Sequence, residues 1–212
     1  RRGGPIARLD RGRPVSSADD AAAAFRAGDL VILPTDTVYG LACTPDADEP
    51  VRALSALKDR PPSRPLALLT GSVDRLLDCV PELRGRSERF ARALLPGPYT
   101  LVFPNPAQRY ARLTGNRPET IGVRVPALSG PAADVLARGT AVAATSANVH
   151  GGPDPRRIED IPVSLLSAVS VVLDGGELPG VPSTVVDLTG AEPRILREGA
   201  IPAAEALAAV AE

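Results

Sequence analysis

The chain has 212 residues and a mass of 21.9 kDa, with 44% hydrophobic and 23% charged residues, which predicts one globular domain with a sizeable core. A formal net charge of −1 excludes attraction to nucleic acid by bulk charge, and no apolar run approaches the ~20 residues of a membrane span. Two cysteines and one histidine, His150, exclude a disulfide scaffold and the common zinc sites, so we expect a soluble, cytoplasmic protein that binds no membrane.

The first residues differ in composition from the rest. Residues 1–14 carry five Arg against one Asp, together with several Gly and Pro. This composition predicts a flexible basic N-terminal arm, followed by one globular domain over residues 15–212. Because position 1 is not Met, we also expect that the sequence is trimmed at its start.

Hydrophobic patterning predicts alternating helices and strands beyond the arm. Ala-rich or 3.6-periodic segments predict helices over residues 18–27, 49–58, 72–79, 82–95, 129–138 and 202–210. Short apolar runs predict strands over residues 29–33, 65–69, 99–103, 120–125, 140–145, 169–173, 184–188 and 194–197. No linker or internal repeat divides these elements, so the pattern favours an α/β domain with one twisted mixed β-sheet flanked by helices.

A polar segment directly follows the first predicted strand. Pro34-Thr-Asp-Thr-Val-Tyr-Gly-Leu41 places two hydroxyls, a carboxylate and a phenol at the end of the sheet. Such residues can form a capped turn by bonding the local backbone, or they can bind a ligand. Both interpretations stay open for this segment.

The single lysine of the chain, Lys58, is followed by Asp59, Arg60 and Pro61, and the other 23 basic residues are all Arg. Pro61 disfavours helical backbone at Arg60, so we expect the helix to end at Lys58 and an extended chain to follow. Lys58 and Arg60 would then face the same side, exposed at a site that holds a polyphosphate or a carboxylate. A solvated surface pair is the alternative, and in either case replacing Lys58 should leave the fold intact.

Polar residues also mark two later strands. Ser146 and Asn148 follow the strand over residues 140–145 and can present a hydroxyl and an amide to one cleft. Arg124 interrupts an otherwise apolar strand and must be paired or reach an anion, because an unpaired buried charge is costly. The chain contains neither GxxxxGK[ST] nor GxGxxG, and no hydrolase elbow lies near His150.

Seven motifs occur in order between residues 28 and 199: PTDTVYGL (34–41), KDRP (58–61), PGPYTLVF (96–103), TIGVRVP (120–126), TSAN (145–148), PSTVVDLT (182–189) and LREG (196–199). Together they resemble the YrdC-type threonylcarbamoyl-AMP synthase (L-threonylcarbamoyladenylate synthase) family. The resemblance implies a YrdC-like fold around a central cavity, similar to dihydroxybutanone-phosphate synthase. It also implies the short stand-alone form, without the C-terminal extension domain of longer members.

The resemblance implies a nucleotidyltransferase that makes threonylcarbamoyl-AMP and pyrophosphate from L-threonine, bicarbonate and ATP, with Mg²⁺ accompanying the ATP. The product would serve the threonylcarbamoyl modification of adenosine 37 in tRNA. The protein would meet tRNA directly or through downstream threonylcarbamoyl-transfer proteins.

The family's site residues fall on matching positions of this chain. The catalytic set would be Lys58, Arg60, Ser146 and Asn148. The contacts to L-threonine would be Thr35, Arg124, Ser146 and Ser183. The contacts to ATP would be Lys58, Arg60, Pro62, Thr120, Asn148 and Arg197. No metal ligand is indicated, and Arg156 stands where family members often carry a hydroxyl residue.

Two other functions are compatible with the same sequence. One is an RNA-binding or ribosome-associated module that uses the arm and a basic helix face, formed by Arg84, Arg86, Arg89 and Arg92. The other is a paralogous carbamoyl-transfer domain, although the Lys-x-Arg and Ser-x-Asn pairs that it would be expected to lack are both intact here.

Overall fold

The computed structural model describes residues 16–211, so the predicted arm over residues 1–14 lies outside the described residues. Within residues 16–211, nine strands form one sheet in the order β7-β1-β2-β6-β3-β5-β4-β8-β9. The strands are β1 (Val31–Pro34), β2 (Tyr39–Cys43), β3 (Ala67–Leu69), β4 (Tyr99–Pro104), β5 (Thr120–Arg124), β6 (Val142–Ser146), β7 (Val171–Val172), β8 (Thr184–Asp187) and β9 (Arg194–Arg197).

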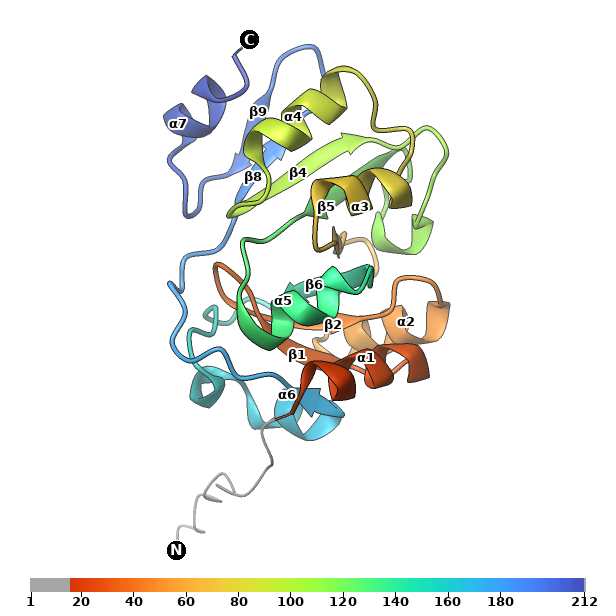
Figure 1. Ribbon diagram of the computed structural model, residues 1–212, viewed down its shortest axis with the longest axis vertical. Coiled ribbons are helices and arrows are strands. Elements are labelled where there is room, and N and C mark those ends of the chain that lie inside the picture. The colour runs from red at the N-terminus through yellow and green to blue at the C-terminus, as the bar shows by residue number, and fades with distance from the viewer. Residues whose placement is uncertain (1–15, 212) are drawn as a thin grey trace, which may run out of the picture.

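The sheet is mixed and helices lie against it (Figure 1). Three pairs, β1–β7, β3–β5 and β4–β8, are parallel and the other pairs are antiparallel, so the predicted mixed sheet is confirmed. The helices are α1 (Ala18–Ala27), α2 (Asp48–Leu57), α3 (Val73–Cys79), α4 (Arg86–Leu94), α5 (Gly130–Ala137), α6 (Val163–Ala168) and α7 (Ala203–Ala208), with short 3₁₀ turns η1 (Ala111–Leu113) and η2 (Ile158–Asp160).

Local sequence signals set the ends of the first helix. Ser17 and Asp20 form a reciprocal capping box in which each side chain satisfies a backbone N–H at the start of α1. Gly28 ends the helix in the left-handed conformation, with φ of 85°, which glycine adopts without steric cost. The helix predicted over residues 18–27 is confirmed with these bounds.

The two faces of the sheet are covered differently. One face carries Ile32, Leu41, Leu68 and Leu101 into a large buried cluster. The other face is apolar in β1, β2 and β6, where α1 and α5 cover it. Further along this second face, β4, β5 and β8 carry small, half-buried residues that belong to neither hydrophobic cluster: Thr100, Val102, Gly122 and Val185. We call this part the open face.

Two elements depart from the sequence prediction. Strand β2 was not predicted, because its residues Tyr39–Cys43 follow polar turn formers and include Gly40, which weakens the strand pattern. It is nonetheless fully buried between β1 and β6. Helix α6 was not predicted either, because its six residues are too few to show a 3.6-residue period and it lacks the Ala-rich composition that indicated the equally short α7.

The sheet ends in two different edges. Strand β7 has two paired residues, whereas β9 is a four-residue strand with Arg at both ends. Within β9, Leu196 is 55% exposed. The longer edge therefore combines an apolar side chain with two cations.

Candidate functional site

The chain turns back after helix α2, so the predicted extended segment from Lys58 to Arg60 is wrong. Lys58 keeps a helical backbone, and Asp59 takes a left-handed conformation with φ of 50°, which Asp tolerates better than most residues. The N–H of Arg60 then donates to the Ser55 carbonyl at 2.9 Å. The preference imposed by Pro61 acts on Arg60, and it does not prevent a tight turn one residue earlier.

Lys58 is buried, with 2% of its surface exposed, which corrects the expectation of an exposed lysine. Its ammonium donates to Asn148 Oδ1 at 2.9 Å and to the Ser146 carbonyl, and lies 3.5 Å from Thr145 Oγ1. Burial, and next the charge of Arg60, lower the pKa of Lys58 to about 8, while Asp154 raises it. The three acceptors compensate for the loss of water around this charge.

Ser146 and Asn148 lie together, as the sequence predicted. Ser146 Oγ donates to Asn148 Oδ1 at 2.7 Å. On the other side of the same amide, Nδ2 donates to the Gly152 carbonyl at 2.7 Å and to Asp154 Oδ1 at 3.2 Å. We call Lys58, Ser146, Asn148 and Asp154 the lysine cluster.

Arg60 stands beside this cluster. Its charge lowers the Lys58 pKa, so the two cations lie close enough to repel each other, as expected of the pair. Arg60 Nη2 donates to the Pro65 carbonyl at 2.7 Å, but its buried Nε has no hydrogen-bond partner within residues 16–211. Pro62 follows in an exposed turn.

Arg124 ends β5 and is 8% exposed. Its Nη2 donates to Asp36 Oδ1 at 2.7 Å and to Thr37 Oγ1 at 3.2 Å, so the buried charge is paired, one of the two outcomes the sequence allowed. Burial lowers the pKa of Arg124, Asp36 raises it and Arg197 lowers it. Its buried Nε, like that of Arg60, has no partner in the part of the chain that the structure describes.

The turn between β1 and β2 is capped by Thr35. Its Oγ1 accepts from the backbone N–H groups of Thr37 and Val38, each at 3.2 Å, and donates to the Val38 carbonyl at 2.7 Å. The capped-turn interpretation is therefore confirmed. The same turn presents Asp36 to Arg124, so the structural interpretation does not exclude a role in binding.

Ser183 and Arg197 meet next to the open face. Arg197 Nη2 donates to the Ser183 carbonyl at 2.8 Å and to its Oγ at 3.1 Å. The Ser183 hydroxyl lies 2.8 Å from Thr100 Oγ1, which belongs to the open face. We call Thr35, Asp36, Arg124, Ser183 and Arg197 the arginine cluster; it holds three of the four side chains expected to contact threonine.

The residues expected to contact ATP do not all gather at one point. Arg197 lies with Ser183, a residue of the threonine set, rather than with Lys58. Thr120 begins β5 and shares a face with Arg124, about 13 Å away by the rise of a strand. The Thr120 hydroxyl donates to the Arg117 carbonyl at 3.1 Å.

Two side chains of these clusters, Asp36 and Asp154, and the neighbouring Thr100 are absent from the predicted site residues. Asp36 lies in the PTDTVYGL motif. The available signal was the need of Arg124, inside an apolar strand, for an anionic partner. Thr100 could have been found from strand alternation, because it shares the open face with Gly122. Asp154 lies in a Gly/Pro-rich loop, outside all seven motifs, and no sequence signal marked it.

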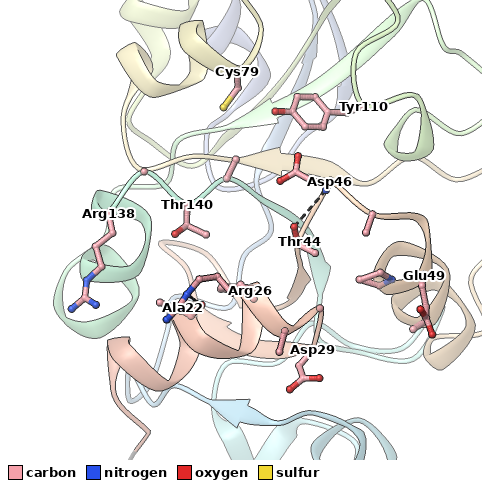
Figure 2. Close-up of a pocket in the computed structure, with 18 of the residues that line it drawn as sticks. Ala22, Arg26, Asp29, Thr44, Asp46, Glu49, Cys79, Tyr110, Arg138 and Thr140 are labelled. Atoms are coloured by element: carbon pink, nitrogen blue, oxygen red, sulfur yellow. Dashed lines mark hydrogen bonds between the residues drawn. The ribbon is translucent and has the colours of Figure 1, made fainter.

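A hollow of about 1040 Å³ lies elsewhere in the molecule, between α1, α2 and the loop after α5 (Figure 2). Its labelled lining includes Arg26, Asp29, Cys79, Tyr110 and Arg138, and none of the predicted site residues borders it. The expectation of a central cavity around the site residues is therefore not met by this hollow. Of those residues, Ser183 contacts the open face through Thr100, and Arg124 and Thr120 share the face of Gly122, whereas Lys58 lies at the end of β6.

The basic helix face proposed as an RNA-binding surface is partly engaged by the protein itself. Arg86 donates to the Gly190 carbonyl at 2.7 Å and lies over the Phe90 ring. Arg92 forms ion pairs with Asp74 and Glu88. Two of the four arginines are thus engaged in contacts within the protein, which argues against a free cationic surface for RNA.

Residues 16–211 contain neither a membrane-spanning helix nor a cluster of metal-ligating side chains. No helix there combines the length and hydropathy that crossing a membrane requires. The same residues contain no group of three His, Cys, Asp or Glu side chains placed to hold a metal ion.

The fold and the clusters define a mixed-sheet α/β protein with two polar clusters that contain the buried cations Lys58 and Arg124. A family model described as "Telomere recombination" (Sua5_yciO_yrdC) matches residues 23–199. The structure of Pyrococcus abyssi Sua5 complexed with L-threonine superposes with a TM-score of 0.81 at 34% identity, covering 91% of this chain and 56% of that one. The chain belongs to the Sua5/YciO/YrdC family, which confirms the resemblance seen in its motifs.

Curated relatives carry an enzyme name. A threonylcarbamoyl-AMP synthase of Pyrococcus abyssi is 34% identical over 186 residues, which cover 87% of this chain and 54% of the relative. A threonylcarbamoyl-AMP synthase of Vibrio vulnificus is 33% identical over 165 residues, which cover 76% of this chain and 87% of the relative. The chain thus spans about half the length of the first relative and most of the second.

Proposed function

We propose that the protein is an L-threonylcarbamoyladenylate synthase, a nucleotidyltransferase that consumes L-threonine, bicarbonate and ATP. The names of the curated relatives and the threonine complex of the Pyrococcus protein support this reaction. One observation of this chain carries the proposal: the Nε atoms of Arg60 and Arg124 are buried donors without a partner among the described residues. Buried donors are almost always paired in proteins, so an anionic ligand is the expected acceptor at both.

The two clusters suit the two substrates. Arg124 can add a hydrogen bond from Nε to the threonine carboxylate, because Asp36 occupies its Nη2 and leaves Nε free. Ser183 and Thr35 lie in the same cluster, and their hydroxyls suit a small polar amino acid. Lys58 and Arg60 would stand by the triphosphate, where two adjacent cations that repel each other gain most from an anion between them.

The chemical step needs charge neutralisation more than it needs a nucleophilic side chain. The threonine amine and bicarbonate form a carbamate with loss of water. A carbamate oxygen then attacks the α-phosphorus of ATP, the bond from that phosphorus to the oxygen bridging to the β-phosphate breaks, and pyrophosphate leaves. Both reactants are anionic, so fixed cations would bring them together and stabilise the charge that develops.

Magnesium would arrive with the triphosphate. The carboxylates of the two clusters are engaged, Asp36 by Arg124 and Asp154 by Asn148, and residues 16–211 hold no three-residue metal cluster. This fits a cation held mainly by phosphate oxygens and water, which is how Mg²⁺ commonly binds with nucleotides. When bound, it would reduce the negative charge on the leaving pyrophosphate.

The product would serve the modification of tRNA adenosine 37, through direct contact with tRNA or through downstream transfer proteins. A cytoplasmic location goes with this proposal because its substrates and tRNA are found there. The carbamoyl-transfer alternative uses the same fold, and the intact Lys58–Arg60 and Ser146–Asn148 pairs favour the synthase over it.

The test is pyrophosphate release from ATP in the presence of L-threonine, bicarbonate and Mg²⁺, with each omitted in turn. We expect release that requires both threonine and bicarbonate. A parallel binding titration compares L-threonine with L-serine and carbamoyl phosphate. Release without threonine, or tighter binding of carbamoyl phosphate than of threonine, would contradict the proposal.

A further inference from the structure

The side-chain amide of Asn148 has no spare hydrogen-bonding capacity. An Asn amide offers two acceptor lone pairs and two donor hydrogens. Here Oδ1 accepts from Lys58 Nζ and Ser146 Oγ, while Nδ2 donates to the Gly152 carbonyl and to Asp154 Oδ1. All four positions are filled by the protein. In this arrangement Asn148 orients Lys58 and Ser146, and it does not itself have a hydrogen bond left for a ligand.

Asp154 determines which way that amide faces. A carboxylate only accepts hydrogen bonds, so it selects Nδ2 as its neighbour and turns Oδ1 toward the lysine. The reverse orientation would point amide N–H groups at the Lys58 ammonium. The Gly152 carbonyl makes the same selection, so the amide is fixed from two points.

The loop that carries Asp154 is attached to the elements around Lys58. The N–H of His150 donates to the Lys58 carbonyl at 3.3 Å, and the N–H of Gly152 donates to the Val149 carbonyl at 2.9 Å. At the end of the loop, the Pro155 carbonyl accepts from the N–H of Tyr39, the first residue of β2, at 3.0 Å. Backbone hydrogen bonds on both sides of Asp154 therefore fix the loop that carries its carboxylate.

Asp154 also offsets the charge environment of the lysine. The groups that shift the Lys58 pKa are Arg60, which lowers it, and Asp154, which raises it. From β6, the groups facing the ammonium are neutral: the Thr145 hydroxyl and the Ser146 carbonyl. Asp59 and His150, next to Lys58 in sequence and across the loop, are exposed. Asp154 is thus the anionic partner of a buried cation that has a cationic neighbour.

We propose that Asp154 is a positioning residue of the active site: through Asn148 it aims the Lys58 ammonium, and its carboxylate supplies negative charge near that buried cation. The proposal rests on the proposed function, in which a charged Lys58 is needed for the triphosphate. It assigns a role to a residue outside every motif that linked the chain to its family.

The single lysine allows a direct measurement. Protein labelled with ¹³C and ¹⁵N in lysine alone gives one set of side-chain signals, from Lys58. We expect the NMR titration of the wild type to follow a pKa of about 8. The Asp154→Asn variant retains a hydrogen-bond acceptor and loses the charge, and its titration should move to lower pH, because the carboxylate that raises the Lys58 pKa is gone.

Three further variants complete the comparison. Asp154→Ala removes both the charge and the acceptor, and provides a second charge-removing variant that does not depend on Asp154→Asn folding. Asp154→Glu restores the charge and should return the titration toward that of the wild type. Glu159→Gln removes an exposed carboxylate elsewhere and should leave the Lys58 titration unchanged.

Activity supplies the second readout. In the wild type, pyrophosphate release should fall on the alkaline side as Lys58 loses its proton, and in Asp154→Asn this fall should occur at lower pH by the same shift as the NMR titration. A merely structural role would lower the rate at every pH without moving that fall. An unmoved lysine titration in both charge-removing variants would overturn the inference. Absence of threonine-dependent release in the wild type would instead contradict the proposed function, and the NMR comparison would still stand.

Discussion

The two polar clusters hold their cations in opposite ways. In the lysine cluster, the Lys58 ammonium faces three oxygen acceptors supplied by the protein, and the Asn148 amide is saturated. In the arginine cluster, Arg124 has a carboxylate partner and still keeps a buried Nε without an acceptor within residues 16–211. One cluster is complete without a ligand, whereas the other retains a hydrogen-bond donor that a ligand can use.

This difference indicates how each cluster would act. A saturated cation contributes through its fixed charge, since its geometry is already established before substrate arrives. An arginine with a free donor contributes through a new hydrogen bond to the ligand, which makes it a determinant of affinity. Substitutions in the lysine cluster should therefore affect turnover most, and substitutions in the arginine cluster should affect threonine binding most.

The largest effect is expected for Lys58→Ala. Loss of a preorganised charge at the reacting phosphates should lower kcat by about 10²- to 10³-fold, measured as threonine-dependent pyrophosphate release. Because Lys58 is buried and satisfies several acceptors, the variant should also lose about 1–3 kcal/mol of unfolding free energy in urea. Arg52→Ala, at an exposed position of α2, is the matched control. An unchanged kcat would remove the lysine cluster from the reaction.

Arg124→Ala should act mainly on threonine. Loss of one hydrogen bond to a charged group corresponds to a 10- to 100-fold rise in the KM for threonine, or about 1.5–3 kcal/mol. Initial rates at varied threonine concentration measure it, and Arg117→Ala, which removes an exposed arginine near the start of β5, should leave the KM unchanged. A fall in kcat with unaltered threonine dependence would reverse the contrast between the clusters.

Asp36→Asn tests what holds Arg124 in place. The Asp36 side chain is 9% exposed, so removing its charge leaves a buried guanidinium without a carboxylate partner. We expect unfolding in urea to require about 1–3 kcal/mol less than in the wild type, because the hydrogen bond can persist without the ionic attraction. Asp160→Asn, an exposed change of the same kind, is the control. Wild-type stability of Asp36→Asn would mean that the ion pair does not stabilise the turn.

The smallest effect is expected for Ser183→Ala. The variant loses the hydroxyl contacts to Thr100 and Arg197, while Arg197 keeps its bond to the Ser183 carbonyl. A neutral hydrogen bond is worth about 0.5–1.5 kcal/mol, so the KM for threonine should rise about 2- to 10-fold. A rise larger than that of Arg124→Ala, measured in the same assay, would make Ser183 rather than Arg124 the main threonine contact.

Most elements of the fold follow from local patterns in the sequence. Strands with continuous apolar runs and Ala-rich helices such as α1 are predicted within a few residues. The pattern failed where tertiary burial overrides local preference, as in β2, whose Gly40 and preceding turn formers resemble a loop. Register between distant strands was not accessible at all, because pairings such as β2 with β6 depend on the folded sheet.

The candidate site was predicted in its residue types more than in its geometry. The Ser146–Asn148 pair and the pairing of Arg124 followed from alternation and from the cost of a buried charge. The burial of Lys58 did not, because a lysine before a proline-containing turn is exposed in most chains. Asp154 could not be inferred, since its partner Asn148 is fixed only once a glycine-rich loop has folded against β2.

The arginines at the two ends of β9 have a consequence for how copies of the protein behave in concentrated solution. An edge strand with unpaired backbone groups and an exposed leucine is a template for strand addition from another molecule. Like charges carried by Arg194 and Arg197 on each copy would repel when two such edges approach, which discourages intermolecular sheet extension. The guanidinium of Arg197 would thereby protect the molecule from aggregation while it also orders Ser183 next to the open face.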